Sequence, residues 1–407
     1  MYITMSKRFE FAASHRYTVD NKSSEQIAML FGKGADSPYG HGHNYVAHLI
    51  FHGPIDPDHG MIINVATVKE RIQKLLAERY DHKFLNEDTP PFNDILPTPE
   101  NIAKTLLSDA TELFDDEAAS PVACRVMEDP DSGAVAYDDG RVERELWLGF
   151  SAARRTCSPH LSDKENSSLF GIAGSKSGHG HHYRLRIVLS GEADERTGMI
   201  VPDGECARIL ADLHAEFDHR FLNSDIAEFR SLPVTTEMLA GVLWRRLKKN
   251  LPLSRLCLFE NDEFFVECSS RDNMYMGLRG SFHAAHRLWN DRMSDEENAR
   301  IYGKCGSSAG HGHRYETELT ITDGLDQRSG TLFPLDRLYR IRDEAVALWD
   351  HKHLDKETDD FSDLLSTGEH IVGRLWSHYE DKLNKRLSRV RLWETPNNRF
   401  TLRRNRP

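Results

Sequence analysis

The chain has 407 residues and a formal net charge of −12, a length that suggests roughly three domains of about 100–200 residues each. The acidic charge argues against nucleic acid or an anionic membrane as a partner, and no apolar run approaches the length of a membrane helix. The first residues lack the apolar core of a signal peptide, and the six cysteines contain no Cys-x-x-Cys pair, so we expect a cytoplasmic protein with reduced thiols.

The first third of the chain predicts strands and then helices. Residues near 5–15 and 43–53 alternate between apolar and polar side chains, as two strands would. A helix is predicted near 64–80, where one stripe is apolar: Val65, Val68, Ile72, Leu75 and Leu76. Residues 98–100 (Thr-Pro-Glu) predict the start of a second helix, so we interpret this threonine and glutamate as caps rather than catalysts.

Four markers recur in one order along the chain and predict an internal triplication. The motif Gly-His-Gly-His occurs three times, with histidines at His41/His43, His179/His181 and His311/His313. A segment led by phenylalanine precedes each motif and carries, as its fifth residue, His15, Arg154 or His286. An Asp-His pair follows at 81/82, 218/219 and 350/351, and a late glutamate closes each copy: Glu128, Glu260 and Glu394.

We place the copies at residues 1–142, 143–272 and 273–407. Each is predicted to be an α+β unit with the order strand, strand, helix, helix, strand, strand, its last two strands forming a hairpin. Such a unit has two open sheet edges. Three units pairing edge to edge would close a twelve-stranded antiparallel barrel with the helices outside. No Gly/Ser-rich or Pro-rich linker separates the copies, which favours tight docking.

The third copy has the fullest set of reactive side chains. Histidines spaced i, i+2 leave a strand on the same face, so His311 and His313 can reach one metal ion. His286, at the end of an earlier predicted strand, is available as a third ligand. Three neutral imidazoles leave a zinc ion one open position, as a catalytic site needs. The first copy has a matching predicted ligand set: His15, His41 and His43.

The third copy resembles the 6-pyruvoyltetrahydropterin synthase / 6-carboxytetrahydropterin synthase family at each of its motifs. The matching residues are His286, Cys305, His311, His313, Asp350-His351, Glu394-Thr395 and Asn397-Asn398. The resemblance implies the tunnelling fold, usually a trimer paired into a hexamer, so this chain would be one covalent trimer and two chains could stack as a homodimer. It also implies zinc, Mg²⁺ accompanying the triphosphate, and a small pterin substrate, 7,8-dihydroneopterin triphosphate.

The resemblance also implies roles. Cys305, held partly as thiolate near the cation, would take a proton from carbon. Asp350 would orient His351, which would shuttle a second proton. The implied pterin-binding residues are Glu394 and Thr395, with Glu128 and Glu260 at matching places. Plainer alternatives remain open: the thiol as a buried apolar filler, and the Asp-His pair as a structural element, because it occurs in all three copies.

The first copy lacks the thiol. Gly34 stands where the cysteine is expected, so we predict that this copy binds zinc and is catalytically weak or silent. Asp36 is a remote candidate for a substitute base.

The middle copy has Arg154 in place of the first histidine and Ala173 in place of the cysteine. A guanidinium cannot ligate a cation, so we predict no zinc at His179/His181. Its Asp218-His219 pair and Glu260 either hold the fold together or serve a site shared with a neighbouring copy.

These features predict a zinc-dependent pterin synthase, a lyase that forms 6-pyruvoyltetrahydropterin with release of triphosphate. The five residues between Cys305 and His311 resemble the pyruvoyl-forming members slightly more, which leaves 6-carboxytetrahydropterin synthase of the queuosine pathway as an alternative. A catalytically idle pterin- or purine-binding scaffold is the alternative of another class, and Cys305 argues against it. A third alternative is a zinc hydrolase, but the sequence does not contain the His-Glu-x-x-His signature of such enzymes.

Overall fold

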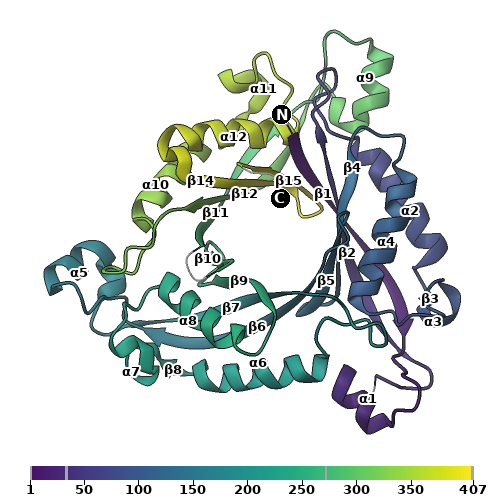
Figure 1. Cartoon of the computed structure of the whole chain (residues 1–407). Helices are drawn as coiled ribbons and strands as arrows, with labels where there is room; N and C mark the ends of the chain where they lie inside the picture. The colour runs from purple at the N-terminus through teal and green to yellow at the C-terminus, as the bar shows by residue number, and fades with distance from the viewer. Residues whose placement is uncertain (1, 33–34, 271–272, 405–407) are drawn as a thin grey trace.

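A computed structural model describes residues 2–32, 35–270 and 273–404. Twelve long strands close one antiparallel barrel and the helices cover its outside (Figure 1), as predicted. The strands are β1 (Tyr2–His15), β2 (His41–Pro54), β4 (Ser120–Asp129), β5 (Ser132–Tyr137), β6 (Val142–Arg154), β7 (His179–Ser190), β9 (Leu253–Phe259), β10 (Phe264–Cys268), β11 (Met274–His286), β12 (His311–Thr322), β14 (Leu387–Thr395) and β15 (Asn398–Arg403). They pair around the barrel in this order, and β15 returns to β1.

The copies join through their edge strands, so no long edge is left open within the barrel. The joining pairs are β5 with β6, β10 with β11, and β15 with β1. The expected junction at residue 142 is the first residue of β6, and the one at residue 272 lies outside the described residues. Three two-residue strands add in parallel: β3 (Lys83–Phe84), β8 (Arg220–Phe221) and β13 (Lys352–His353).

Two long helices pack on the outer face of each copy, and the third copy's Thr367 caps the second of them as the matching Thr98 and Thr235 do. The long helices are α2 (Val65–Arg79), α4 (Pro99–Leu113), α6 (Asp203–Phe217), α8 (Thr236–Lys248), α10 (Leu335–Val346) and α12 (Gly368–Leu383). Short helices follow the Asp-His pairs: α3 (Leu85–Asp88), α7 (Leu222–Asp225) and α11 (Leu354–Glu357). No helix in the described ranges is long and apolar enough to cross a membrane.

One further helix in each copy was not predicted. It lies between the first two strands: α1 (Ser24–Phe31), α5 (Asp163–Phe170) and α9 (Asp295–Tyr302). Each begins with a capping box, in which Ser23, Ser162 or Ser294 bonds reciprocally with a Gln or Glu three residues later. This Ser-x-x-Glu/Gln pattern is a readable sequence signal. The helix matters because in the third copy it leads directly into the turn that holds Cys305.

The two faces of the barrel wall have different roles. In β2, Tyr45, Ala47 and Leu49 are buried in the core under the helices, whereas His48 and Ile50 line the inside of the barrel. Because side chains alternate along a strand, His41 and His43 share the outer face with Tyr45. The predicted metal ligands therefore lie outside the barrel wall, at strand ends.

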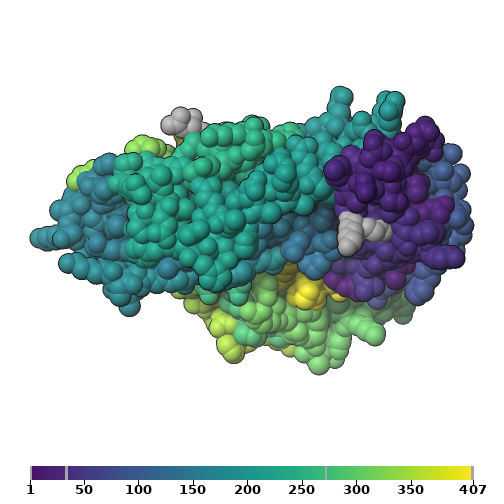
Figure 2. Space-filling model, turned by 90° about the horizontal axis from the view of Figure 1, so that it is seen from below, coloured from purple at the N-terminus to yellow at the C-terminus, as the bar shows by residue number. Residues whose placement is uncertain are grey.

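Each copy also contacts its neighbour close to its own histidines. The Thr367 hydroxyl donates to the carbonyl oxygen of Gly60, and the Ile62 N–H donates to Glu369. The same two bonds join Thr98 and Glu100 to Gly198 and Ile200, and Thr235 and Glu237 to Gly330 and Leu332. These hydrogen bonds join the three copies in a ring. In Figure 2 the teal middle copy lies directly against the purple first copy.

Candidate metal centre

In the third copy, the three predicted imidazoles converge. His286, the last residue of β11, pairs across the sheet with His311, the first residue of β12, and the Nε2 atoms of these two rings are 3.1 Å apart. Ligand atoms of His286, His311 and His313 all lie within 4.8 Å of one another. The buried Nε2 of His313 has no hydrogen-bond partner among the described residues. Such a buried, unsatisfied nitrogen in a three-imidazole set fits a metal ion.

The surroundings orient His286 and favour the neutral form of His311 and His313. His286 is fully buried, and its Nδ1 is 2.9 Å from the carbonyl oxygen of Ser366. An N–H at Nδ1 that donates to this oxygen leaves Nε2 free to accept a metal. Burial and the neighbouring imidazoles lower the pKa of His311 to about 4, and burial also lowers that of His313. Neutral imidazole is the form that ligates zinc.

The glutamate that closes the third copy faces the same point. Oε1 of Glu394 is 3.7 Å from Nε2 of His286 and 3.9 Å from Nε2 of His313. Its other oxygen accepts a hydrogen bond from Asn398 at 3.4 Å. Thr395 accepts the backbone N–H of Asn397, so its observed hydrogen bond belongs to the turn. The Glu394 carboxylate therefore has one oxygen toward the imidazoles.

Cys305 lies in the short turn Gly303–Gly306 and is half-buried. Its backbone is fixed because its carbonyl oxygen accepts the N–H of Leu288, two residues beyond His286. Burial, and next the charge of Glu394, raise the pKa of the Cys305 thiol. The sulfur is not one of the ligand atoms grouped within 4.8 Å, so this group consists of the three imidazoles without the thiol. The predicted thiolate character therefore depends on a bound cation offsetting both effects.

A loop of the first copy also packs close to Cys305. Met61, Leu288 and Tyr302 form a small buried cluster against which Cys305 packs, and the Tyr302 hydroxyl donates to the carbonyl oxygen of His59. The sequence does not predict this contact, because it joins residues some 240 positions apart. The signal available was the repeated Gly-Met-Ile at residues 60–62 and 198–200.

The Asp350-His351 pair has a clear backbone function. Asp350 accepts the N–H of His283 on β11, and the N–H of His351 donates to the carbonyl oxygen of His283. His351 has a positive φ of 59°, and its ring is 77% exposed. The same backbone bonds are made by Asp81-His82 and Asp218-His219. Among described residues the His351 side chain contacts Asp350 and His283 but none of the three converging histidines, so its part in proton transfer stays a prediction.

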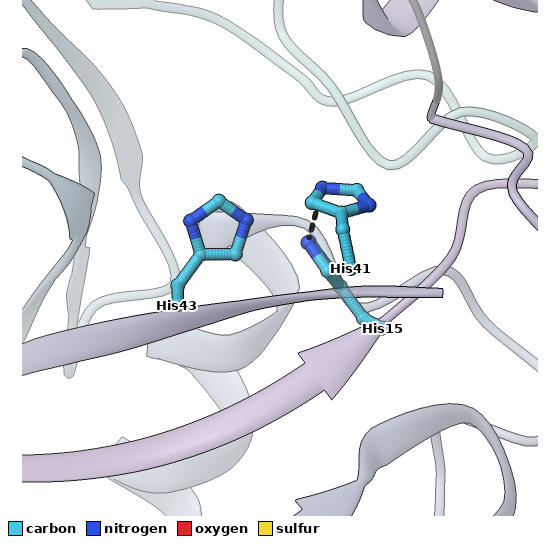
Figure 3. Close-up of side chains that lie close together, drawn as sticks. All are labelled: His15, His41 and His43. Atoms are coloured by element: carbon cyan, nitrogen blue, oxygen red, sulfur yellow. Dashed lines mark hydrogen bonds between the residues drawn. The ribbon is translucent and has the colours of Figure 1, made fainter. Parts of the chain in front are cut away.

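The first copy repeats the convergence without the thiol (Figure 3). Nε2 of His15 is 3.2 Å from Nε2 of His41, and His43 completes the group. Glu128 is 3.2 Å from His15, and burial raises the pKa of this glutamate to about 7. Gly34 lies outside the described residues. Ala35 makes the backbone bond that Cys305 makes in the third copy, and no described contact joins Asp36 to these histidines.

In the middle copy, Arg154 occupies the place of the first histidine. It pairs across the sheet with His179, is 4% exposed, and donates to Glu260 at 2.6 Å and to Thr236 at 3.0 Å. Glu260 also lies 3.2 Å from His181. Ala173 makes the backbone bond of the thiol position. Ligand atoms of His179, His181 and Glu260 lie within 4.8 Å of one another, with the cationic guanidinium beside them. A neighbouring positive charge disfavours a bound cation, and the absence of zinc from this copy stays a prediction.

Each copy resembles one family of enzymes. The model of the 6-pyruvoyl tetrahydropterin synthase family matches residues 4–139, 148–271 and 276–405. Human 6-pyruvoyl tetrahydrobiopterin synthase is 37% identical over 122 residues, which are 30% of this chain and 84% of the human protein. A putative 6-carboxy-5,6,7,8-tetrahydropterin synthase of Archaeoglobus fulgidus is 31% identical over 89 residues, which are 22% of this chain and 73% of that protein.

Among solved structures, 6-pyruvoyl tetrahydropterin synthase of Caenorhabditis elegans covers 32% of this chain and 95% of its own, at 32% identity and a TM-score of 0.31. The human protein, of which 84% matches 30% of this chain, corresponds in length to about one copy. Three successive matches account for most of the residues in the sequence. The chain belongs to the 6-pyruvoyl tetrahydropterin synthase family, in three tandem copies.

Proposed function

We propose that the chain is a zinc-dependent pterin synthase in which the third copy alone carries the chemistry. The substrate proposed is 7,8-dihydroneopterin triphosphate, and the products are 6-pyruvoyltetrahydropterin and triphosphate. The observation that carries this proposal is the coincidence, in one copy, of three converging imidazoles, a carboxylate and a thiol. The first copy lacks the thiol, and the middle copy lacks both the thiol and the third imidazole.

His286, His311 and His313 would hold the zinc ion, which supplies a Lewis acid that lowers the pKa of the substrate's side-chain hydroxyls. Cys305, beside the ligands, would take the proton from carbon. Glu394 would accept N–H bonds from the aminopyrimidine edge of the pterin, a planar donor pair that suits a carboxylate. The buried loop of Met61 would exclude water on the side of the first copy.

Several further assignments belong to the same proposal. His351, oriented by Asp350, is proposed as a second proton shuttle, and Mg²⁺ as the companion of the triphosphate. We also propose that two chains pair and that the protein is cytoplasmic.

The test is turnover by the zinc-loaded chain, followed as triphosphate release and as the mass of the pterin product. Cys305→Ala should reduce turnover by about 10²–10⁴-fold, the range for removing a general base. Cys157→Ala is the matched control, because Cys157 is a half-buried free cysteine of the middle copy. Equal turnover by the Cys305→Ala variant and the native chain would reject the proposed mechanism, and no turnover by the native chain would favour an idle pterin-binding scaffold.

A second candidate is 6-carboxytetrahydropterin synthase, because a relative with that putative name is 31% identical over part of this chain. Both candidates use the same residues and differ in what remains at C6 of the pterin. The mass of the product distinguishes them directly.

A further inference from the structure

The inside of the barrel is a cavity with an excess of positive charge. Its volume is ≈ 370 Å³, and it lies in the centre of the ring seen in Figure 1. Nine arginines line it: Arg125, Arg141, Arg186, Arg255, Arg279, Arg389, Arg391, Arg399 and Arg403. Five acidic residues line it: Asp138, Asp139, Glu145, Glu267 and Glu318. The lining therefore carries a formal charge of +4, nine minus five, in a chain whose total is −12.

The acidic residues neutralise only part of this set. Glu318, on β12, is shared by Arg279 at 3.1 Å, Arg391 at 2.9 Å and Arg389 at 3.4 Å. Glu145 pairs with Arg125 at 2.5 Å. Three lining arginines make no ion pair with any described residue: Arg186, Arg399 and Arg403. The cavity lining therefore contains arginine side chains whose positive charge has no carboxylate partner among the described residues.

Neighbouring arginines also lower one another's pKa, because each positive charge makes a second one nearby less favourable. Burial and the charges of Arg125 and Arg403 lower the pKa of Arg399 to about 10. Burial together with nearby arginines lowers the pKa of His48 to about 3. These shifts have the sign expected of a region at positive potential. A bound anion would relieve this repulsion.

We propose that the barrel interior is a binding site for oligophosphate anions, separate from the metal centres. Planar guanidinium groups bind phosphoryl oxygens through paired N–H donors, and several adjacent phosphoryl groups match several unpaired arginines. Arg403 is exposed, so the site is open to solvent. The inward residues of β2, such as His48, lie on the opposite face of the strand from His41 and His43. The inference does not depend on the proposed function.

The test measures binding of inorganic tripolyphosphate to the zinc-loaded full chain by calorimetry. The double variant Arg399→Gln/Arg403→Gln should bind at least tenfold more weakly. A charge-matched control is Arg208→Gln/Arg340→Gln, two exposed helix-surface arginines, which should bind as the native chain does. Tripolyphosphate should raise the Tm of the native chain and of this control. It should raise the Tm of Arg399→Gln/Arg403→Gln, the lumen variant, much less.

Three results would overturn the inference. One is equal affinity of the lumen variant and its control. Another is loss of binding in His311→Ala/His313→Ala with no effect of the lumen changes, which would place the anion at the metal centre. The third is orthophosphate binding as tightly as tripolyphosphate, which would exclude a multi-phosphate site. If the double variant does not fold, Arg186→Gln replaces it, with an expected threefold or greater loss of affinity.

Discussion

The third and middle copies share one backbone plan, and the clearest difference between their sites is at one buried position. His286 and Arg154 are each the last residue of a long strand, each opposite the first histidine of the Gly-His-Gly-His motif. Both are almost fully buried, at 0% and 4% exposure. In the third copy an imidazole adds a ligand atom to two others. In the middle copy a guanidinium puts a positive charge at the same place.

The consequence extends to the glutamate of each copy. Glu394 keeps an oxygen directed at its histidines, with Asn398 as its hydrogen-bond donor. Burial would raise the pKa of Glu260, but the charge of Arg154 and a hydrogen bond from Thr236 lower it. Glu260 is thus committed to an internal ion pair. At this position the third copy has an imidazole directed at two others, whereas the middle copy has an internal ion pair, on the same strand framework.

The largest expected effect comes from giving the third copy the arginine of the middle copy. His286→Arg should lose the third copy's zinc and reduce turnover by at least about 10²-fold, because the metal and the substrate geometry depend on it. His15→Arg makes the same change in the first copy and should leave turnover unchanged. Steady-state triphosphate release measures both. Equal losses in the two variants would show that the first copy is catalytic too.

The next effect is on stability. Glu260→Gln leaves Arg154 charged and unpaired in a buried place, which should lower the free energy of unfolding by about 2–4 kcal/mol. Glu394→Gln breaks no such pair, so it should change stability by less than about 1 kcal/mol and raise KM for the pterin. Denaturant titration and kinetics separate the two. An unchanged free energy of unfolding in Glu260→Gln would mean that the ion pair between Arg154 and Glu260 does not stabilise the middle copy.

A smaller effect concerns pH. Burial, with the charge of Glu394, raises the pKa of Glu369 to about 8, whereas Glu237, near Arg154, reaches about 7. A carboxyl whose folded pKa is raised contributes stability that is complete below the unfolded value of 4.5 and is lost as pH rises through the folded pKa. The native chain should therefore lose stability relative to Glu369→Gln between about pH 4.5 and 8. Glu237→Gln should show the same trend, ending nearer pH 7. Parallel curves for native and Glu369→Gln chains would contradict this.

The smallest effect is expected in the middle copy's Asp-His pair. His219→Asn keeps a residue that tolerates the positive φ of 55° and removes the imidazole. Turnover should be unchanged, because the observed role of the pair is to fix the backbone of Ser151. His351→Asn, the same change in the third copy, should reduce turnover by about tenfold or more if that ring transfers a proton. Loss of turnover in His219→Asn with an intact fold would support a site shared between copies.

The sequence predicted the barrel and the converging histidines because both follow from short-range regularities. Alternation with period two places His311 and His313 on one face, and strand pairing places His286 opposite them. The triplication exposed the open edges that had to pair. Arg154 could be interpreted at once because a guanidinium has no lone pair to offer a metal.

Other features depended on contacts that no periodicity encodes. The packing of Met61 beside Cys305 joins the first and third copies. The backbone role of Asp350 explains why the pair recurs whether or not a metal set is complete. The arginines of the barrel interior alternate with core residues, as an ordinary solvent-facing strand would, so closure of the barrel alone reveals that they face one another.

The most direct test of the difference between His286 and Arg154 is the zinc content of the purified full-length chains, measured by elemental mass spectrometry. We expect two zinc ions in the native chain, one in His286→Arg and three in Arg154→His. The same zinc content in all three proteins would contradict this expectation, because the identity of that one buried residue would then not decide whether a copy holds a metal.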